Sequence, residues 1–397
     1  MNPRYQVVAG SFLTQFFVIG VLFSLGLYVK VFEAEFGWSR TLVSGANALS
    51  FFMMGALAVV AGRLSDRFGP RRVLTVSGLT FAVGLAGLSQ ITQPWHLFAL
   101  MATFIAVGLS THDVVTLSTI ARWFRKRRGL MTAVAKVGTA TGQITLPLVT
   151  AVLIATVGWR ETFLVLGAAG VVVLLLAAAL MRNPRPDETG SAAQGQAASG
   201  LSFAQARGTR SLWMLCAIQF LFFSALMTIP MHLAAHGMDM GMSTAHAATL
   251  LSVVGSASVA GRLAIGVLVD RIGCRNALSL CLMILVVALS GYALATAPIL
   301  LFAVTAVYGF THGALFVVVS PTVAHYFGMR AHGEIFGAVL FFGTIGSALG
   351  PIAAGAVFDL TGSYVPAFTT LALFAAVALI LARALPASAP QEAHSTV

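Results

Sequence analysis

The sequence predicts an all-α membrane protein with twelve transmembrane helices arranged in two six-helix halves. Three observations predict this fold class: a very apolar composition, a series of apolar segments long enough to cross a bilayer, and an internal repeat. Of the 397 residues, 58% are hydrophobic and only 9% are charged, with a mean hydropathy of +0.92. A water-soluble globule of this length carries far more polar surface, so we expect lipid to solvate this chain.

Crossing about 30 Å of hydrocarbon takes about 20 apolar residues in a helix. The first such segment lacks a small-residue cleavage site and exceeds the length of a signal-peptide core, so we expect it to be retained as a span. The predicted spans are residues 7–30, 42–62, 73–91, 97–121, 130–156, 162–181, 211–236, 245–267, 277–295, 298–326, 335–357 and 365–384.

The formal charge of +11 raises the possibility of a nucleic-acid partner, and the positions of the cations argue against it. Most of the 23 Lys and Arg residues fall in alternate loops, with Arg clusters in residues 66–72, 122–128 and 270–275. This is the positive-inside pattern of a protein in the cell (inner) membrane with both termini in the cytoplasm. We therefore expect the lipid bilayer, and no nucleic acid, as the surroundings of the chain.

A polar stretch divides the sequence into two halves. Residues 182–210 are rich in Pro, Gly, Ser and charged residues, which is typical of a flexible coil, and a short amphipathic helix is expected near residues 201–206. The predicted domains are an N-terminal six-helix bundle (1–181), a cytoplasmic linker (182–210), a C-terminal six-helix bundle (211–385) and a disordered tail (386–397).

Part of the chain repeats 204 positions later. Residues 62–69 read GRLSDRFG and residues 266–273 read GVLVDRIG, with Gly, Asp, Arg and Gly in the same places. Duplicated helical bundles are typical of secondary transporters, in which the substrate site lies between the halves near the bilayer midplane. Further pairs keep the spacing: Gly142 and Gly346, Pro147 and Pro351, Gly158 and Gly362.

The segment from Gly62 to Arg72 resembles the signature loop of the major facilitator superfamily, and its second copy strengthens the likeness. The carboxylate of Asp66 can lie at a helix terminus and pair with arginines, while the glycines allow a tight turn. A purely topological and stabilising role for these loops is the alternative to a gate. We expect a cytoplasmic gate that contains Asp66, Arg67, Arg71, Asp270 and Arg271.

Several shorter patterns are similar to the branch of this superfamily that holds the monocarboxylate transporters and the oxalate/formate antiporters. The patterns are Glu35-Phe-Gly-Trp38-Ser-Arg40, Trp123-Phe124 before Arg127-Arg128-Gly129, Gly158-Trp159-Arg160, Gly261-Arg262, Tyr326-Phe327-Gly328, Gly350-Pro351 and Asp359-Leu-Thr-Gly362-Ser-Tyr364.

The sequence also departs from that branch. Ser258 stands where mammalian-type members carry an aspartate, and the first span lacks their lysine. The eleventh span lacks the second cation of the oxalate antiporters, which favours a monoanion over a dianion.

Arg262 is the first candidate for binding substrate. It lies about 12 Å along a helix from Asp270, too deep in the membrane for a guanidinium without a role. Arg stays protonated and binds a carboxylate through two parallel hydrogen bonds. The family resemblance implies the same role for this residue, and a structural ion pair with Asp113 or with a neighbouring helix is the alternative.

His112 and Asp113, near the middle of the fourth span, are the candidates for proton coupling. A carboxylic acid in a low dielectric takes up a proton more readily, and an imidazole titrates near neutral pH. A fixed ion pair or hydrogen bonds to a neighbouring helix would be the alternative role for Asp113. The Thr-His pair at 111–112 is echoed at 311–312 in the tenth span, so His312 is a further candidate.

Lys136 lies about two turns into the fifth span. We expect its stem to follow apolar neighbours and its ammonium to reach the cytoplasmic interface. If Lys136 instead faces the cavity, a dicarboxylate becomes a possible substrate. By depth alone, the remaining candidates for substrate contact are Ser258, Gln15, Phe23, Gln143 and Phe342. His232 and the three cysteines Cys216, Cys274 and Cys281 are interpreted as packing residues.

These patterns predict a secondary active transporter of a small monocarboxylate of the lactate or pyruvate type, working by proton-coupled symport and alternating access. An organic anion exchanger of the oxalate/formate type and a transporter-like anion sensor are the alternatives. We find no enzyme constellation and expect no cofactor and no metal. The expected partners are a small organic anion and a proton, and the chain is expected to act as a monomer.

Overall fold

The prediction of twelve membrane-spanning helices is confirmed. The computed structural model describes residues 2–185, 188 and 200–386, and these contain twelve helical spans long and apolar enough to cross a membrane. Part of the predicted linker, residues 186–187 and 189–199, lies outside the described residues, as does the predicted disordered tail from residue 387. A short helix, α11 (Phe203–Arg207), forms where the linker was expected to be helical.

The helices of the first half follow the predicted spans. They are α1 (Pro3–Ser24), continued by the 3-10 turn η1 (Leu25–Leu27) and by α2 (Tyr28–Phe36); α3 (Arg40–Phe68); α4 (Pro70–Leu88); α5 (Pro94–Leu100), the π-helical η2 (Met101–Ile105) and α6 (Ala106–Trp123), which together make one span; α7 (Arg128–Val157); and α8 (Trp159–Leu180).

The helices of the second half repeat this series. They are α12 (Arg210–Asp239), α13 (Thr244–Ile272), α14 (Cys274–Leu294), α15 (Pro298–Phe327), α16 (His332–Thr361) and α17 (Val365–Ala384). The bounds of α13 and α16 are those of α3 and α7 shifted by 204 residues (40 to 244, 68 to 272, 128 to 332, 157 to 361). The sequence repeat is therefore a repeat of helices.

Equivalent residues set the ends of α3 and α13. The hydroxyls of Ser39 and Ser243 each accept a hydrogen bond from a backbone N–H in the first turn, at Leu42 and His246. At the other ends the chain turns through Gly69 and Gly273, with φ of 84° and 81°, a region that favours glycine. The repeated glycines of the sequence thus end two long helices in the same way.

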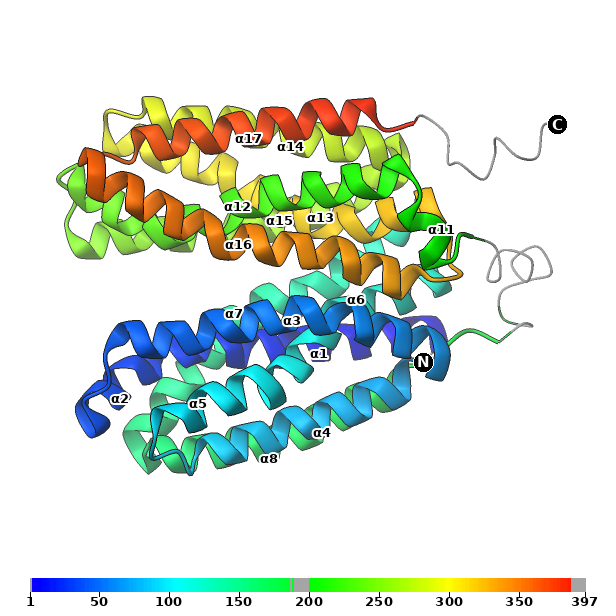
Figure 1. Cartoon of the computed structure of the whole chain (residues 1–397), viewed down its shortest axis with the longest axis horizontal. Helices are drawn as coiled ribbons and strands as arrows, with labels where there is room; N and C mark the ends of the chain where they lie inside the picture. Colours follow the sequence, from blue (N-terminus) through cyan, green and yellow to red (C-terminus); the bar gives the residue numbers. More distant parts are fainter. Residues whose placement is uncertain (1, 186–187, 189–199, 387–397) are drawn as a thin grey trace. The chain divides into compact units, whose positions relative to one another are not determined.

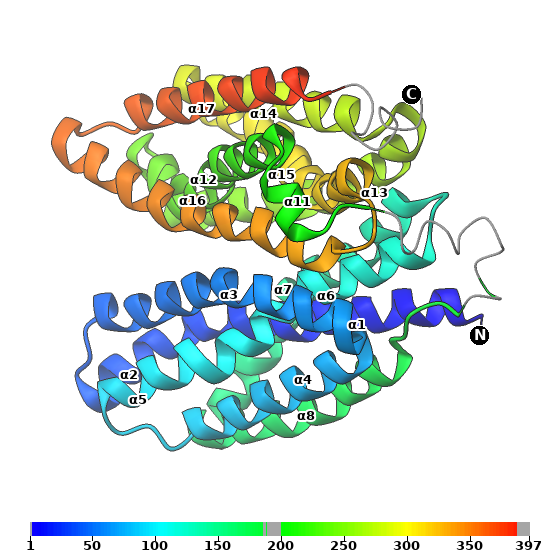
Figure 2. The ribbon, with the colours of Figure 1, turned by 45° about the vertical axis from the view of Figure 1, so that its right-hand side comes forward.

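The residue contacts group the chain into two compact units. Unit 1 comprises residues 1–125, 134–199 and 329–337, and unit 2 comprises residues 126–133, 200–328 and 338–397. The first turns of α7 and α16 belong to the opposite unit from the rest of each helix, a feature that the predicted domain limits do not contain. Within unit 1, α4 and α8 lie side by side, and within unit 2, α14 and α17 do so (Figure 1, Figure 2).

Two of the motifs that resemble the monocarboxylate transporter branch, residues 35–40 and 158–160, meet in unit 1 at the end where α8 begins. The Glu35 carboxylate accepts hydrogen bonds from the indole N–H of Trp159 and from the guanidinium of Arg160. The hydrogen bond from Arg160 holds the pKa of Glu35 below its ordinary value. Phe32 packs edge-on against Trp38 and Trp159, with ring centroids 5.7 and 5.3 Å apart. These motifs therefore fasten α2 to α8.

In unit 2, close contact between α13 and α15 fixes the backbone that carries Arg262. A Cβ atom at Gly261 would lie 1.8 Å from the carbonyl oxygen of Phe310, and one at Gly313 would lie 1.9 Å from that of Ser258. Small residues let membrane helices approach this closely. The position of Arg262 thus depends on the glycine directly before it.

We predict that Gly261→Ala destabilises the protein, because the added methyl group would meet the backbone of α15. Overpacking of this kind costs about 1–3 kcal/mol. Gly255→Ala on the same helix is the matched control: a Cβ there meets nothing within 4 Å, and Gly→Ala at a compatible site stabilises by about 0.4–1 kcal/mol. Thermal unfolding of both variants in detergent gives the comparison, and equal melting temperatures would contradict the close packing.

Candidate functional site

The two copies of the repeated loop each place a carboxylate at the N-terminus of a helix. In unit 1, Asp66 accepts hydrogen bonds from the backbone N–H groups of Gly333 and Glu334, at 3.3 and 3.2 Å. In unit 2, Asp270 accepts them from Gly129 and Leu130, at 2.9 and 3.1 Å. A carboxylate is stabilised at a helix N-terminus by the exposed N–H groups and by the helix dipole.

Asp66 has an arginine partner that the sequence reasoning missed. Arg122, at the end of α6, forms an ion pair with Asp66 and donates a second hydrogen bond to the side chain of Asn183 at 2.9 Å. The side chains of the predicted gate arginines Arg67, Arg71 and Arg271 are exposed. Arg122 stands in an Arg-rich loop, but the sequence separation of 56 residues gave no signal that it meets Asp66.

Gln15, His112 and Asp113 come together in a buried polar cluster of unit 1. The amide of Gln15 donates to Asp113 Oδ1 and to the backbone carbonyl of His112, both at 2.8 Å. The Gln15 carbonyl in turn accepts from the hydroxyl of Thr139 on α7, also at 2.8 Å. Gln15 therefore links α1, α6 and α7, and it lies with the candidates for proton coupling.

The expectation that Lys136 reaches the cytoplasmic interface is wrong. Its side chain is only 2% exposed, and its ammonium lies 2.5 Å from Asp113 Oδ1. An uncompensated charge in an apolar bundle costs on the order of several kcal/mol. The Asp113 carboxylate offsets this cost for the Lys136 ammonium, so the side chain need not extend to the membrane interface. The alternative role considered for Asp113, an ion pair with a neighbouring helix, is present in the structure, and its partner is Lys136.

Arg262 is the most deeply buried cation of unit 2 among the described residues. It is 1% exposed, and its guanidinium carbon lies 5.8 Å from the centre of the Phe316 ring, within the range of a cation–π contact. One turn before it, Ser258 lies 3.4 Å from His312 Nδ1, and the His312 and Phe316 rings are 5.2 Å apart. The Phe316 ring therefore contacts two predicted residues, Arg262 and His312, and His312 in turn contacts a third, Ser258.

The Thr-His echo is not part of the duplication. The helices correspond at a spacing of 204 residues, so His312 matches Gly108, and His112 matches Phe316. The two Thr-His pairs are 200 residues apart, which is about one helical turn out of this register. His312 nevertheless contacts the same Phe316 ring as Arg262.

The other depth-based candidates lie elsewhere. Phe23 is 52% exposed on α1, and Gln143 is partly buried on α7. Phe342 packs edge-on against Trp213, with centroids 6.0 Å apart. His232 is a packed, hydrogen-bonded residue, as interpreted, with contacts to the Tyr364 hydroxyl at 3.1 Å and to the Pro351 carbonyl at 3.0 Å. Cys216 and Cys281 are buried.

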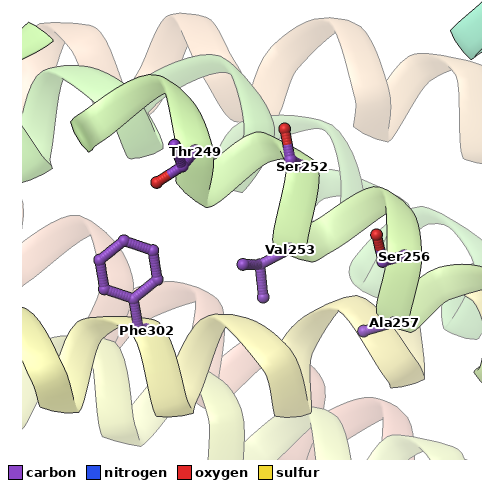
Figure 3. Close-up of a pocket in the computed structure, with 6 residues that line it drawn as sticks. All are labelled: Thr249, Ser252, Val253, Ser256, Ala257 and Phe302. Carbon is purple, nitrogen blue, oxygen red and sulfur yellow. The ribbon is translucent and has the colours of Figure 1, made fainter. Parts of the chain in front are cut away.

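A groove of about 460 Å³ lies between α13 and α15, and none of the predicted site residues lines it. Val253 and Phe302 point into the gap between the two helices, while the hydroxyls of Ser252 and Ser256 point away from Phe302 (Figure 3). The lining residues are Thr249, Ser252, Val253, Ser256, Ala257 and Phe302. Since this lining offers no cation, it cannot neutralise a carboxylate, and Arg262 remains the better candidate for an anion.

Comparison with known proteins agrees with this architecture. The model of the family described as the Major Facilitator Superfamily matches residues 11–301 and 239–396. The chain is 29% identical over 328 residues to MFS-type transporter 1 of Ophiocordyceps sp. (strain BCC 1869), covering 80% of this chain and 70% of the relative. It is 28% identical over 386 residues to monocarboxylate transporter 13 of Rattus norvegicus, covering 93% and 86%.

A solved structure with the same fold is that of the proton:xylose symporter XylE. It superimposes with a TM-score of 0.79 and covers 96% of this chain and 95% of the symporter. The sequence identity of 13% means that this likeness speaks for the fold alone.

We predict that Asp66→Asn lowers the melting temperature in detergent more than Asp270→Asn does. Both variants weaken charge-assisted hydrogen bonds to a helix N-terminus, but only the first also leaves Arg122 without its carboxylate. Breaking such a pair from one side costs about 3–5 kcal/mol when it is well buried. The double variant Asp66→Asn with Arg122→Gln should cost less than the sum of the single changes. Arg125→Gln, an exposed neighbour, is the control, and additive single costs would contradict the pairing.

Proposed function

Because the chain belongs to the Major Facilitator Superfamily and is a transporter of small molecules, we propose that it carries a small monocarboxylate of the lactate or pyruvate type together with a proton. The observation that carries the proposal is the burial of Arg262 against Phe316, whose ring also contacts His312, which in turn contacts Ser258. A guanidinium stays protonated even when it is buried, so Arg262 keeps a positive charge inside the bundle. Its planar fork matches a carboxylate, and the aromatic ring suits a substrate with a small apolar body.

A monoanion fits the charges better than a dianion. α16 contains no Lys or Arg, so the second half offers Arg262 as its one cation deep within a span. The other such cation, Lys136, is held by Asp113. The similarity to monocarboxylate transporter 13 supports the same substrate class. His112 and Asp113 are the proposed carriers of the proton.

Alternating access accounts for the two carboxylates at helix N-termini. We propose that Asp66 and Asp270, with Arg122, hold the Arg-rich end of the protein closed, and that this end faces the cytoplasm with both termini. Arg67, Arg71 and Arg271 are exposed charges of the same loops. Opening requires hydrogen bonds at both copies to break, so the gate depends on the duplication.

The experiment is uptake of labelled L-lactate and pyruvate into proteoliposomes with and without an inward proton gradient. We expect accumulation that depends on the gradient and disappears in Arg262→Ala. Uptake that ignores the gradient and follows an internal anion would instead identify an exchanger. No uptake of either acid by the wild-type protein would contradict the proposed substrate class.

Arg262→Lys should reduce the apparent affinity for the anion by about 10- to 100-fold, although the charge is kept. The reason is that Lys cannot form the two parallel hydrogen bonds, and a hydrogen bond to a charged group contributes about 1.5–3 kcal/mol. Arg330→Lys, an exposed position, is the matched control for the same chemical change. Near-normal affinity in Arg262→Lys would exclude the proposed role of the guanidinium.

A further inference from the structure

Lys136 has no role in the proposed function, yet its ammonium is buried against the proposed proton carrier. We propose that Lys136 is a positioning residue that keeps Asp113 ionised in the empty transporter and thereby makes proton loading conditional on the anion. This inference rests on the proposed function, since it concerns how the same proton is coupled. The argument has three steps: the protons that the contacts allow, the charge of the cluster, and the groups around it.

The contacts of His112 leave a site for one proton between its ring and Asp113. His112 Nδ1 lies 2.5 Å from the backbone carbonyl oxygen of Leu109, which can only accept, so Nδ1 carries a hydrogen. Nε2 then faces Asp113 Oδ2 at 3.4 Å. In a neutral ring Nε2 is an acceptor, as is an ionised carboxylate. Imidazole and carboxylate therefore form a site for one proton, which either group can hold.

The charge of the cluster decides when that proton binds. With a neutral His112, the ammonium of Lys136 and the carboxylate of Asp113 sum to zero. Binding one proton raises the charge of this cluster to +1, while the monocarboxylate proposed to bind at Arg262 adds a charge of −1 to the protein as a whole. A net charge in a low-dielectric interior is costly, so proton and anion favour each other's binding, and by linkage the effect is reciprocal. Without Lys136 the empty cluster would be −1, and Asp113 would take the proton with no anion present.

Few other charged groups lie on the helices around Asp113 where they could affect its protonation. Among the described residues, the ionisable groups in contact with it are His112 on α6 and Lys136 on α7. The helices α1, α3 and α4 also pack against α6, and they carry their charged residues near their ends. These are Arg4, Arg40, Arg63, Asp66, Arg67, Arg71 and Arg72. Lys136 is thus the permanent charge that can set the proton affinity of Asp113.

The geometry also keeps Asp113 in place when it is neutral. Gln15 donates to Asp113 Oδ1 and is itself held by Thr139 and by the carbonyl of His112. These hydrogen bonds do not need the Lys136 charge, so the carboxyl group stays beside His112 in either protonation state. The side chain of Asp113 is 12% exposed and that of Lys136 is 2% exposed. Proton exchange is therefore expected through the carboxyl group.

The test counts the protons taken up per L-lactate bound by purified protein in weakly buffered detergent solution, with a pH indicator. We expect about one proton per lactate in the wild type and in Lys136→Arg, which keeps the cation. Lys136→Met and Asp113→Asn should bind lactate with close to zero protons, the first because the carboxyl is already protonated and the second because it cannot titrate. Adding Lys136→Met to Asp113→Asn should change the proton count no further, because Lys136 acts through Asp113.

The pH profile supplies a second readout, which a merely structural role would not move. In proteoliposomes, Lys136→Met should keep lactate counterflow but lose accumulation driven by a proton gradient, and the pH dependence of its uptake should shift to higher pH. If Lys136→Met fails to elute as a folded protein, Lys136→Gln, whose amide can donate to the carboxyl group, carries the same test. Lys126→Met, at an exposed position, is the control for the substitution itself.

The outcomes separate this inference from the proposed function. A count near one in the wild type and Lys136→Arg, with a count near zero in Lys136→Met, supports the inference. A count near one in both the wild type and Lys136→Met overturns it and leaves proton-coupled lactate transport standing. If the wild type binds no lactate, or binds it without a proton, the proposed function fails and the inference fails with it.

Discussion

The burial of ionised groups in an apolar helix bundle is the constraint on which the rest of this structure depends. Only 9% of the residues are charged, and those that lie within the spans are costly unless an opposite charge or several donors face them. Lys136 meets Asp113, and Arg122 meets Asp66. Arg262 lies against an aromatic ring in unit 2, where a carboxylate substrate would offset its charge. Each of these charges therefore indicates a specific interaction.

The duplication supplies the scaffold and the residues of the proposed gate, whereas the charges proposed for binding and coupling occur in one copy each. Asp66 and Asp270 occupy equivalent positions and contact equivalent helix termini. By contrast, Asp113, Lys136 and Arg122 correspond to Val317, Leu340 and Tyr326, and Arg262 corresponds to Ala58. The helices are repeated but these charges are not. Under the proposed function, one half would therefore hold the proton and the other would hold the anion.

The sequence was sufficient for the fold because the signals for it are local. Span length, loop charge and the glycines at helix ends depend on neighbouring residues, and the twelve predicted spans appear in the structure. Individual contacts depend on helix rotation, which a nearly uniform apolar sequence does not reveal. For that reason Gln15 was expected against substrate but joins Asp113, and Arg122 was missed. The predicted position of the Lys136 ammonium was wrong because the sequence does not show that the Asp113 carboxylate lies across the helix interface.

His112 and Phe316 occupy the same position in the repeat, but their side chains contact groups of opposite charge. At the same place in the repeat, α6 carries an imidazole beside Asp113 and α15 carries a phenyl ring beside Arg262. A titratable ring is useful next to a carboxylate, because the two can hold one proton between them. A ring that never ionises is suited to a position next to a guanidinium, because its face attracts the cation without titrating. Under the proposed function, this one position of the repeat would serve proton binding in one half and anion binding in the other.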